Sequence, residues 1–179
     1  MTDETVEIPE GVEISIEGPA VSTKGSKGEL KRVFRHPKIR IERKDNKISL
    51  SASNATKREK KVMGTFRAHI NNMIKGVSEG HSYKLKICSG HFPMNVSMEK
   101  GQFTVKNFLG EKLPRTMSVG DDVEVKIDGS EVVVESINKE AAGQTAANIE
   151  KLTSIKGRDK RIFQDGIYIT EKDGKPVAK

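Results

Sequence analysis

The side chains best placed to do chemistry in this sequence are amides and cations near its C-terminal end. Gln144 and Asn148 stand four residues apart, which is one turn of a helix, and Lys151 follows at helical spacing. The next segment carries a single acid, Asp159, among the cations Lys156, Arg158, Lys160 and Arg161, and it ends in Phe163. Amides form hydrogen bonds and cations displace the counterions of phosphates, which favours docking on a phosphate backbone. The alternative is an amphipathic helix followed by a solvated loop.

Other reactive side chains form weaker patterns. Cys88 and His91 have the spacing of half a zinc site, but this is the only cysteine and no second half matches. Cys88 also ends an alternating segment, where a cysteine usually packs as a small hydrophobe. Turn chemistry explains Asp121 and Asp122 beside Gly120. Because no nucleophile, base and orienting group assemble, we expect no enzyme, metal or cofactor; an activity requiring Cys88 or His91 would overturn this.

A helix beginning near Asn138 is expected to position the amides. Asn138 is a suitable N-cap, and Glu140 lies in the first turn, where an acid is favoured. The apolar stripe is made of small residues and contains Gly143, although glycine costs a helix interior about 1 kcal/mol relative to alanine. Small residues permit another backbone to come close, either that of the helix's own sheet or that of an RNA strand. The stripe consists of Ala142, Ala146, Ile149 and Leu152 or Thr153.

The net charge predicts a polyanionic partner, and the distribution of charge along the chain shows which segments are acidic and which are basic. The 179 residues carry a net charge of +7, with −6 in residues 1–23 and +10 in residues 24–61. The basic stretch has three interpretations: a solvated face, a surface for RNA phosphates, or a contact for an acidic protein. Its only aromatic residue is Phe34, so stacking on unpaired bases has little support. A lone cysteine and the lack of a long apolar run predict a soluble, intracellular protein.

Strands followed by one helix occur twice along the chain, which predicts an α+β fold of two similar tandem domains. In the first half, alternating segments precede a helix that opens with a capping box at Thr56 and Glu59 and ends at Gly76 or Gly80. We expect a flexible acidic arm over 1–11, an N-terminal domain over 12–80 and a C-terminal domain over 81–179 that holds the helix, basic loop and tail. The expected strands are 12–17, 30–34, 39–41, 48–51, 81–88, 96–98, 103–105, 114–117, 123–127 and 132–137, with a loop at 22–28.

Three runs of this sequence carry a family resemblance: 142–149 (AGQTAANI), 157–168 (GRDKRIFQDGIY) and the loop 107–112 (NFLGEK). They resemble the universal L-six family of large-subunit ribosomal proteins in its archaeal and eukaryotic form, over nearly the whole chain. The run 157–168 is the most specific of the three. The lysine- and glycine-rich tail typical of bacterial members is missing, so their tail contacts are not carried over.

The resemblance implies two similar α+β domains, each an antiparallel sheet with one helix packed on it. It also implies a cytoplasmic structural constituent of the large ribosomal subunit that binds ribosomal RNA near the translation-factor-binding region, at the base of the lateral stalk. The implied partners are large-subunit ribosomal RNA and neighbouring ribosomal proteins, with no membrane and no small-molecule substrate. The expected RNA contacts are Gly143, Gln144, Ala147, Asn148, Lys151, Lys156, Gly157, Arg158, Lys160, Arg161, Phe163, Asn107 and Lys112. The alternative is a protein–protein adaptor for which RNA contact is incidental.

Overall fold

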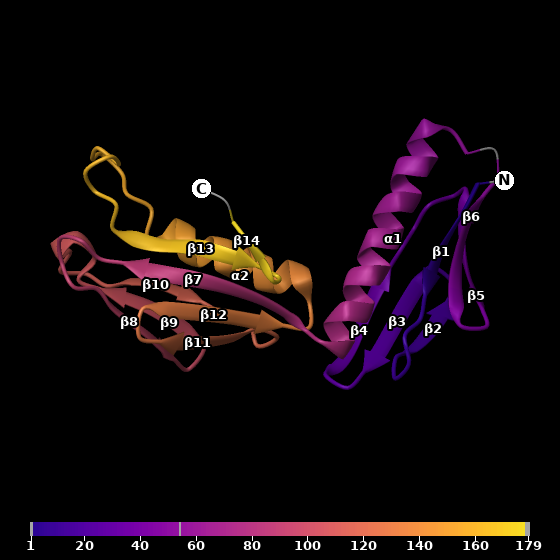
Figure 1. Cartoon of the computed structure of the whole chain (residues 1–179), viewed down its shortest axis with the longest axis horizontal. Helices are drawn as coiled ribbons and strands as arrows, with labels where there is room; N and C mark the ends of the chain where they lie inside the picture. The colour runs from indigo at the N-terminus through magenta and orange to yellow at the C-terminus, as the bar shows by residue number, and fades with distance from the viewer. Residues whose placement is uncertain (1, 54, 178–179) are drawn as a thin grey trace. The chain divides into compact units, whose positions relative to one another are not determined.

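The chain forms two compact units, Met1–Gly80 (unit 1) and His81–Lys179 (unit 2). Figure 1 shows the computed structural model, which describes residues 2–53 and 55–177. Each unit combines antiparallel strands with one α-helix, so the predicted α+β class is confirmed. No helix within the described residues is long and apolar enough to cross a membrane.

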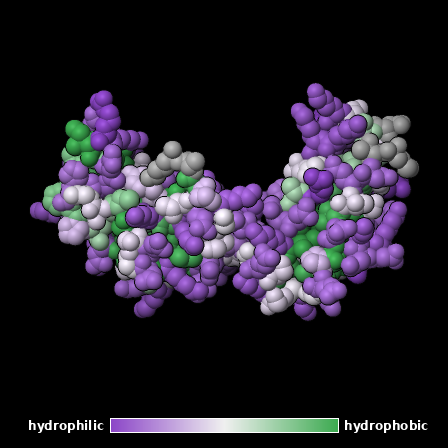
Figure 2. All heavy atoms as spheres, in the orientation of Figure 1, coloured by the Kyte–Doolittle hydropathy of each residue, from purple (hydrophilic) through white to green (hydrophobic). Residues whose placement is uncertain are grey.

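Unit 1 consists of two three-stranded antiparallel sheets and helix α1, which packs against strands of both. Its core lies between the helix and the strands, where Figure 2 shows hydrophobic residues framed by hydrophilic ones. The first sheet has the order β1 (Thr2–Glu7), β6 (Lys47–Ala52), β5 (Ile39–Lys44). The second has the order β2 (Glu13–Glu17), β3 (Ala20–Gly25), β4 (Gly28–Val33).

Helix α1 (Lys57–Ser78) begins at the predicted capping box. The Glu59 carboxylate accepts the backbone N–H of Thr56 at 2.9 Å, and the Thr56 hydroxyl accepts that of Arg58 at 3.3 Å. This arrangement satisfies N–H groups that lack partners inside the first turn. The helix ends before Gly80, whose φ of +82° suits glycine, and not at Gly76.

Two loop predictions in unit 1 are wrong. Residues 2–7 are not a flexible arm: they form β1, paired antiparallel to β6, with Val6 at 3% and Ile8 at 4% exposure. Acids on the opposite face of β1 hide this alternation in the sequence. Likewise, the expected loop at 22–28 is mostly strand β3, because Val21 and Thr23 point into the core and only a short turn follows Gly25. Met1, at the start of the expected arm, lies outside the described residues.

Unit 2 repeats this topology and extends it. The order β7–β12–β11 reproduces β1–β6–β5, and β8–β9–β10 reproduces β2–β3–β4. Helix α2 (Lys139–Leu152) follows β12, as α1 follows β6. The strands are β7 (His81–Cys88), β8 (Asn95–Glu99), β9 (Gln102–Lys106), β10 (Arg115–Ser118), β11 (Glu124–Asp128) and β12 (Glu131–Ser136), with a 3-10 turn η1 (Phe108–Gly110).

The added element of unit 2 is a strand that the sequence reasoning placed nowhere. Strand β13 (Gly166–Lys172) pairs antiparallel with the second edge of β7, and β14 (Lys175–Pro176) pairs with β13. Thr153 at the end of α2 accepts the N–H of Ile167 through its side-chain oxygen at 2.9 Å. The helix therefore does not close the unit, since the chain after it returns to the middle of the sheet.

Candidate nucleic-acid interface

Helix α2 separates its residues into a buried face and an exposed face. The Asn138 side chain caps the helix by accepting the N–H of Glu140 at 3.0 Å, as the sequence predicts. The buried face consists of Ala142, Thr145, Ala146 and Ile149. The exposed face consists of Gln144, Ala147, Asn148 and Lys151. Helical periodicity alone therefore gathers four of the predicted RNA contacts on one surface.

Gly143 differs from these four because it approaches its own sheet. A Cβ at Gly143 would lie 3.1 Å from the hydroxyl oxygen of Tyr83 on β7. Ala146, also considered as a point of close RNA approach, is fully buried. The small residues could serve packing on the helix's own sheet or close approach of an RNA strand. Packing on the sheet accounts for both Gly143 and Ala146. Ala147 is the small residue that faces solvent.

The two amides of the exposed face are joined to each other. Gln144 donates through Nε2 to Oδ1 of Asn148 at 2.9 Å. An amide has one oxygen acceptor and two N–H donors, so this bond fixes the orientation of both groups. The Gln144 oxygen and the Asn148 NH₂ group then remain to bind a ligand, one as acceptor and the other as donor.

The basic loop, defined as residues 154–165, follows the helix and is organised by one aromatic ring. Arg158 lies over the Phe163 ring at 4.9 Å, and the His91 ring stacks against Phe163 at 4.7 Å. Arg161 pairs with Asp159 at 2.8 Å and remains 90% exposed. The other predicted contacts of the loop, Lys156, Gly157 and Lys160, are exposed.

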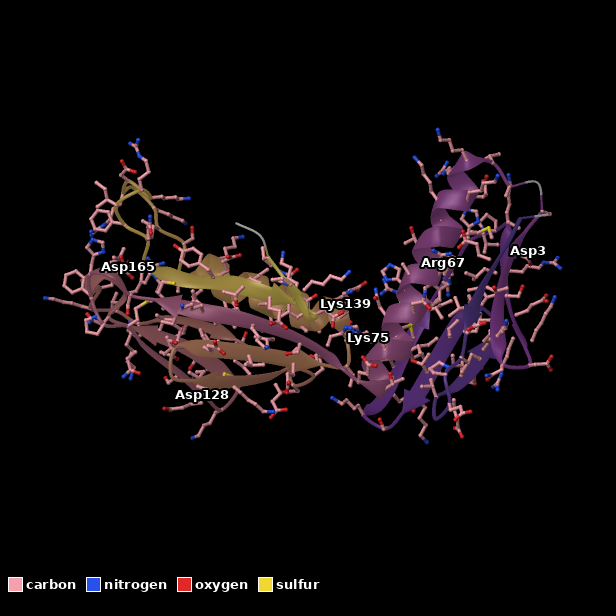
Figure 3. All side chains as sticks on the ribbon, in the orientation of Figure 1. Asp3, Arg67, Lys75, Asp128, Lys139 and Asp165 are labelled. Carbon is pink, nitrogen blue, oxygen red and sulfur yellow. The ribbon has the colours of Figure 1, made fainter. Side chains whose placement is uncertain are left out.

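A buried carboxylate anchors the end of this loop. Asp165, labelled in Figure 3, is 1% exposed and accepts the backbone N–H groups of Gly90 at 2.6 Å and His91 at 2.9 Å. Its second oxygen faces His91 Nδ1 at 2.5 Å. Burial is the largest effect on the pKa of Asp165 and raises it, but the hydrogen bonds and the charge of His91 together outweigh burial and hold the pKa below its usual range.

His91 therefore has a role that sequence spacing did not suggest. The sequence grouped it with Cys88 as half a metal site, whereas the structure pairs it with Asp165. No group of three or more His, Cys, Asp or Glu side chains placed to hold a metal occurs in the described part of the chain. The pairing spans 74 residues, so no local pattern marks it.

Arg115, at the start of β10, brings the loop 107–114 to the end of α2. Its Nη1 donates to the carbonyl oxygen of Leu152 at 2.7 Å and to that of Ser154 at 3.3 Å. Its Nε and Nη2 bind the two Glu111 oxygens at 2.8 and 2.6 Å, and its guanidinium lies 4.3 Å from the centre of the Phe108 ring. The side-chain hydrogen bond from Arg115 is the largest effect on the pKa of Glu111 and lowers it. The sequence alone indicated no role for Arg115.

The two predicted contacts in this loop are placed differently. Asn107 adopts a left-handed conformation, with φ of +59°, and donates through Nδ2 to the Pro93 oxygen at 3.0 Å. Asparagine tolerates this conformation better than most residues, which explains its presence there. Lys112 is exposed.

A hollow lies where the helix face meets the basic loop. It is lined on the helix side by Ala147, Glu150 and Lys151 and on the other side by Ser154, Lys160 and Tyr168, among others. The fold and this surface define a class: a tandem α+β repeat whose second unit presents a cationic, amide-bearing surface beside a hollow.

Comparison with known proteins identifies the family. The family model described as ribosomal protein L6 matches residues 8–80 and 92–166, one segment in each unit. The chain belongs to the ribosomal protein L6 family, and the resemblance seen in the sequence is confirmed.

Three archaeal relatives are similar over almost their full lengths, and each is named large ribosomal subunit protein uL6. The protein of Methanococcus vannielii is 49% identical over 96% of this chain and 94% of the relative. The protein of Methanosarcina mazei is 48% identical over 94% and 96%, respectively. The protein of Methanobrevibacter smithii is 47% identical over 95% and 96%.

Proposed function

We propose that this protein is a structural constituent of the large ribosomal subunit that binds ribosomal RNA through unit 2. The family membership supports this assignment, and one observation in the structure carries the choice of surface. The exposed face of α2 and the basic loop meet around one hollow, whose lining includes Lys151 from the helix and Lys160 from the loop, with Glu150 beside Lys151. Two cations at one hollow suit a phosphate backbone that passes close to both.

In this proposal, phosphates bind mainly by charge. Replacement of condensed counterions by protein cations supplies most of the affinity and makes it depend on salt. Ala147 allows the sugar–phosphate backbone to approach the helix, and Lys112 extends the contact from the neighbouring loop. The proposed cations are Lys151, Lys156, Arg158, Lys160 and Arg161.

Hydrogen bonding adds geometry to this charge. The free acceptor of Gln144 suits a 2′-hydroxyl group, and the free donors of Asn148 suit a phosphate oxygen or a second hydroxyl group. The faces of Phe163 already contact Arg158 and His91, so we assign Phe163 to holding Arg158 in place and not to stacking on a base. Recognition would therefore depend on the shape and backbone of folded RNA.

We further propose that the RNA lies near the translation-factor-binding region at the base of the lateral stalk, and that neighbouring ribosomal proteins there are the other partners. Its place in the cell is then the ribosome. The proposal requires no cofactor, substrate or membrane. Crosslinking in cells, with peptide and nucleotide both identified, tests the location: crosslinks between residues 144–163 and RNA far from that region would contradict it.

The choice of surface is tested by reversing Lys156 and Lys160 to glutamate together. Both side chains are exposed, and no partner is seen for either among the described residues, so the fold should be unchanged. Because neutralised phosphates set the salt dependence, the slope of log affinity for large-subunit ribosomal RNA against log salt should become shallower. The expected change is roughly one for each phosphate that the variant no longer neutralises.

The matched control reverses Lys86 and Lys100, which are also exposed and lie on β7 and on the turn after β8. It changes the net charge by the same amount. We expect the control to leave the slope near that of the unmodified protein. Equal effects of both double variants would show that total charge, and not this surface, determines binding.

A further inference from the structure

Unit 1 contains a hollow at the open edge of β5 that the proposed RNA surface does not use. Strand β5 is the last strand of its sheet. The buried side chains of Phe34 and Ile39, at 5% and 8% exposure, form the floor of the hollow. Two prolines, Pro19 and Pro37, also line it, and both are exposed. Two exposed cations, Arg35 and Arg40, also line the hollow.

The edge of β5 is bridged to β2 at the end away from the hollow. Arg43, near the far end of β5, donates to the carbonyl oxygen of Ile14 on β2 at 2.8 Å. At the other end, residues 34–38 connect β4 to β5 through a turn at Pro37 and Lys38, and both Pro19 and Pro37 line the hollow there. The edge therefore meets β2 near Arg43, and the hollow lies beside Ile39.

The corresponding connection in unit 2 also contains a turn but is shorter. The N–H of Phe34 donates to the Pro19 oxygen at 2.7 Å, and at the equivalent place the N–H of Val119 donates to the Gly101 oxygen at 2.8 Å. In unit 2 the N–H of Val123 then closes a turn by donating to the Gly120 oxygen at 3.1 Å. The connection in unit 1 is one residue longer, since 39 − 34 is five and 123 − 119 is four.

The charge at this position is opposite in the two units. The hairpins β5–β6 and β11–β12 each turn over two residues, so Lys44 corresponds to Asp128 and Arg40 to Glu124. The connections before them carry Arg35 and Lys38 in unit 1 against Asp121 and Asp122 in unit 2. Lys38 pairs with Glu59 at 3.7 Å, whereas no ion pair of Arg35 or Arg40 is seen among the described residues. Asp3 and Glu42, however, line a second hollow together with Arg40.

We propose that this hollow is a docking site for an extended, acidic segment of a protein partner. An apolar side chain of the segment enters between Pro19 and Pro37, and carboxylates on either side of it pair with Arg35 and Arg40. The free edge of β5 supplies main-chain hydrogen bonds to the segment, as in other cases of strand addition. The site lies in unit 1 and is independent of the RNA contacts proposed for unit 2.

A protein segment fits these features better than RNA does. The two arginines would bind phosphates, but the apolar floor and proline walls offer nothing to a sugar–phosphate backbone. An unpaired base needs an exposed ring on which to stack. Phe34 is buried beneath the hollow and packs edge-on against Phe66 at 5.0 Å. The half-buried His36, whose Nδ1 accepts the N–H of Lys38 at 3.3 Å, is therefore the single ring in the described lining that a base could reach. A peptide uses the apolar floor, the cations and the strand edge together.

Short fluorescent peptides provide the test with the full-length protein. The first carries acidic residues around a central leucine, the second replaces the leucine by serine, and the third replaces the acids by lysine. Fluorescence anisotropy should show binding of the first peptide only. Reversing Arg35 and Arg40 to glutamate should weaken that binding by about tenfold or more, because each ion pair becomes a repulsion.

The matched control reverses Lys60 and Lys61 of α1 to glutamate. Both residues are exposed, and their reversal changes the net charge by the same amount as that of Arg35 and Arg40. This variant should bind the first peptide like the unmodified protein, and thermal melting should show that all variants are folded. Equal binding of the leucine and serine peptides would overturn the proposal, because the hollow would then play no part. The proposal would also be overturned if the protein bound a duplex RNA but none of the peptides, and if that RNA binding depended on Arg35 and Arg40 alone.

Discussion

Arg115 donates a hydrogen bond to the carbonyl oxygen of Leu152 at 2.7 Å and thereby ties the loop 107–114 to the C-terminal end of α2. Carbonyl groups in the last turn of a helix have no partner inside the helix, and a cation at that end also interacts favourably with the helix dipole. One side chain thus fixes the loop that carries Lys112 relative to the helix end where the basic loop begins.

The first prediction concerns this tie. Replacing Arg115 by methionine keeps the bulk of the side chain but removes the bonds to Leu152 and Glu111, so the free energy of unfolding should fall by about 1–3 kcal/mol. Denaturant unfolding measures this change. Replacing exposed Lys112 by methionine is the control and should change stability little. An Arg115 variant as stable as the unmodified protein would contradict a structural role for the tie.

The second prediction concerns the pH dependence created by Asp165. Its pKa is lower in the folded protein than the ordinary value of 3.8, so its contribution to stability is complete above that value. The contribution is lost as the pH falls through the lower, folded pKa. Replacing Asp165 by asparagine should therefore destabilise the protein at neutral pH and flatten the acid side of its stability profile. Asparagine at exposed Asp128 is the control; thermal melting from pH 7 to pH 2 distinguishes the two.

The third prediction concerns the capping box of α1. The side-chain hydrogen bond from Thr56 is the largest of the effects that lower the pKa of Glu59 from 4.5 to about 2. The stability due to ionised Glu59 is thus present above pH 4.5 and lost as the pH falls through about 2. Glutamine at this position should lower the melting temperature at pH 6 and have a much smaller effect near pH 2. If the variant and the unmodified protein differed in melting temperature by the same amount at both pH values, the charge of Glu59 would not contribute to stability.

The fourth prediction separates the two interpretations of Gly143. Alanine improves helix propensity by about 1 kcal/mol, but its Cβ would lie 3.1 Å from the Tyr83 hydroxyl oxygen. Because the Tyr83 ring is buried and held in the core, we expect this contact to outweigh the gain and to destabilise the protein by roughly 1 kcal/mol net. Changing Tyr83 to phenylalanine as well should remove the contact and recover the stability.

RNA affinity completes the test at Gly143. If the glycine serves packing on β7, alanine should leave RNA affinity unchanged in a filter-binding titration under conditions where the protein is folded. Weaker RNA binding by both the single variant and the double variant with phenylalanine at 83 would instead show that RNA approaches the helix there.

Local signals predicted much of the fold. The capping residues Thr56 and Asn138 mark the starts of both helices, because a side chain there binds N–H groups only two or three residues away. The hairpin at Asp128 and Gly129 is equally local. Strand β1 was missed because its outward-facing acids resemble a solvated arm, and only pairing with β6 shows that Val6 and Ile8 belong to the core.

Amino-acid order alone was enough to predict which residues of α2 face outward, how cationic the segment after it is, and the family to which the chain belongs. The first two properties depend on helical periodicity and composition, and the family resemblance depends on specific runs such as 157–168; all of these are local in the chain. The folded arrangement was needed to show that Gly143 packs on Tyr83, that Asp165 binds His91 and that Arg115 reaches Leu152. Each of these contacts joins residues far apart in the chain, and burial and hydrogen bonding select such pairs only after the sheet and helix have come together.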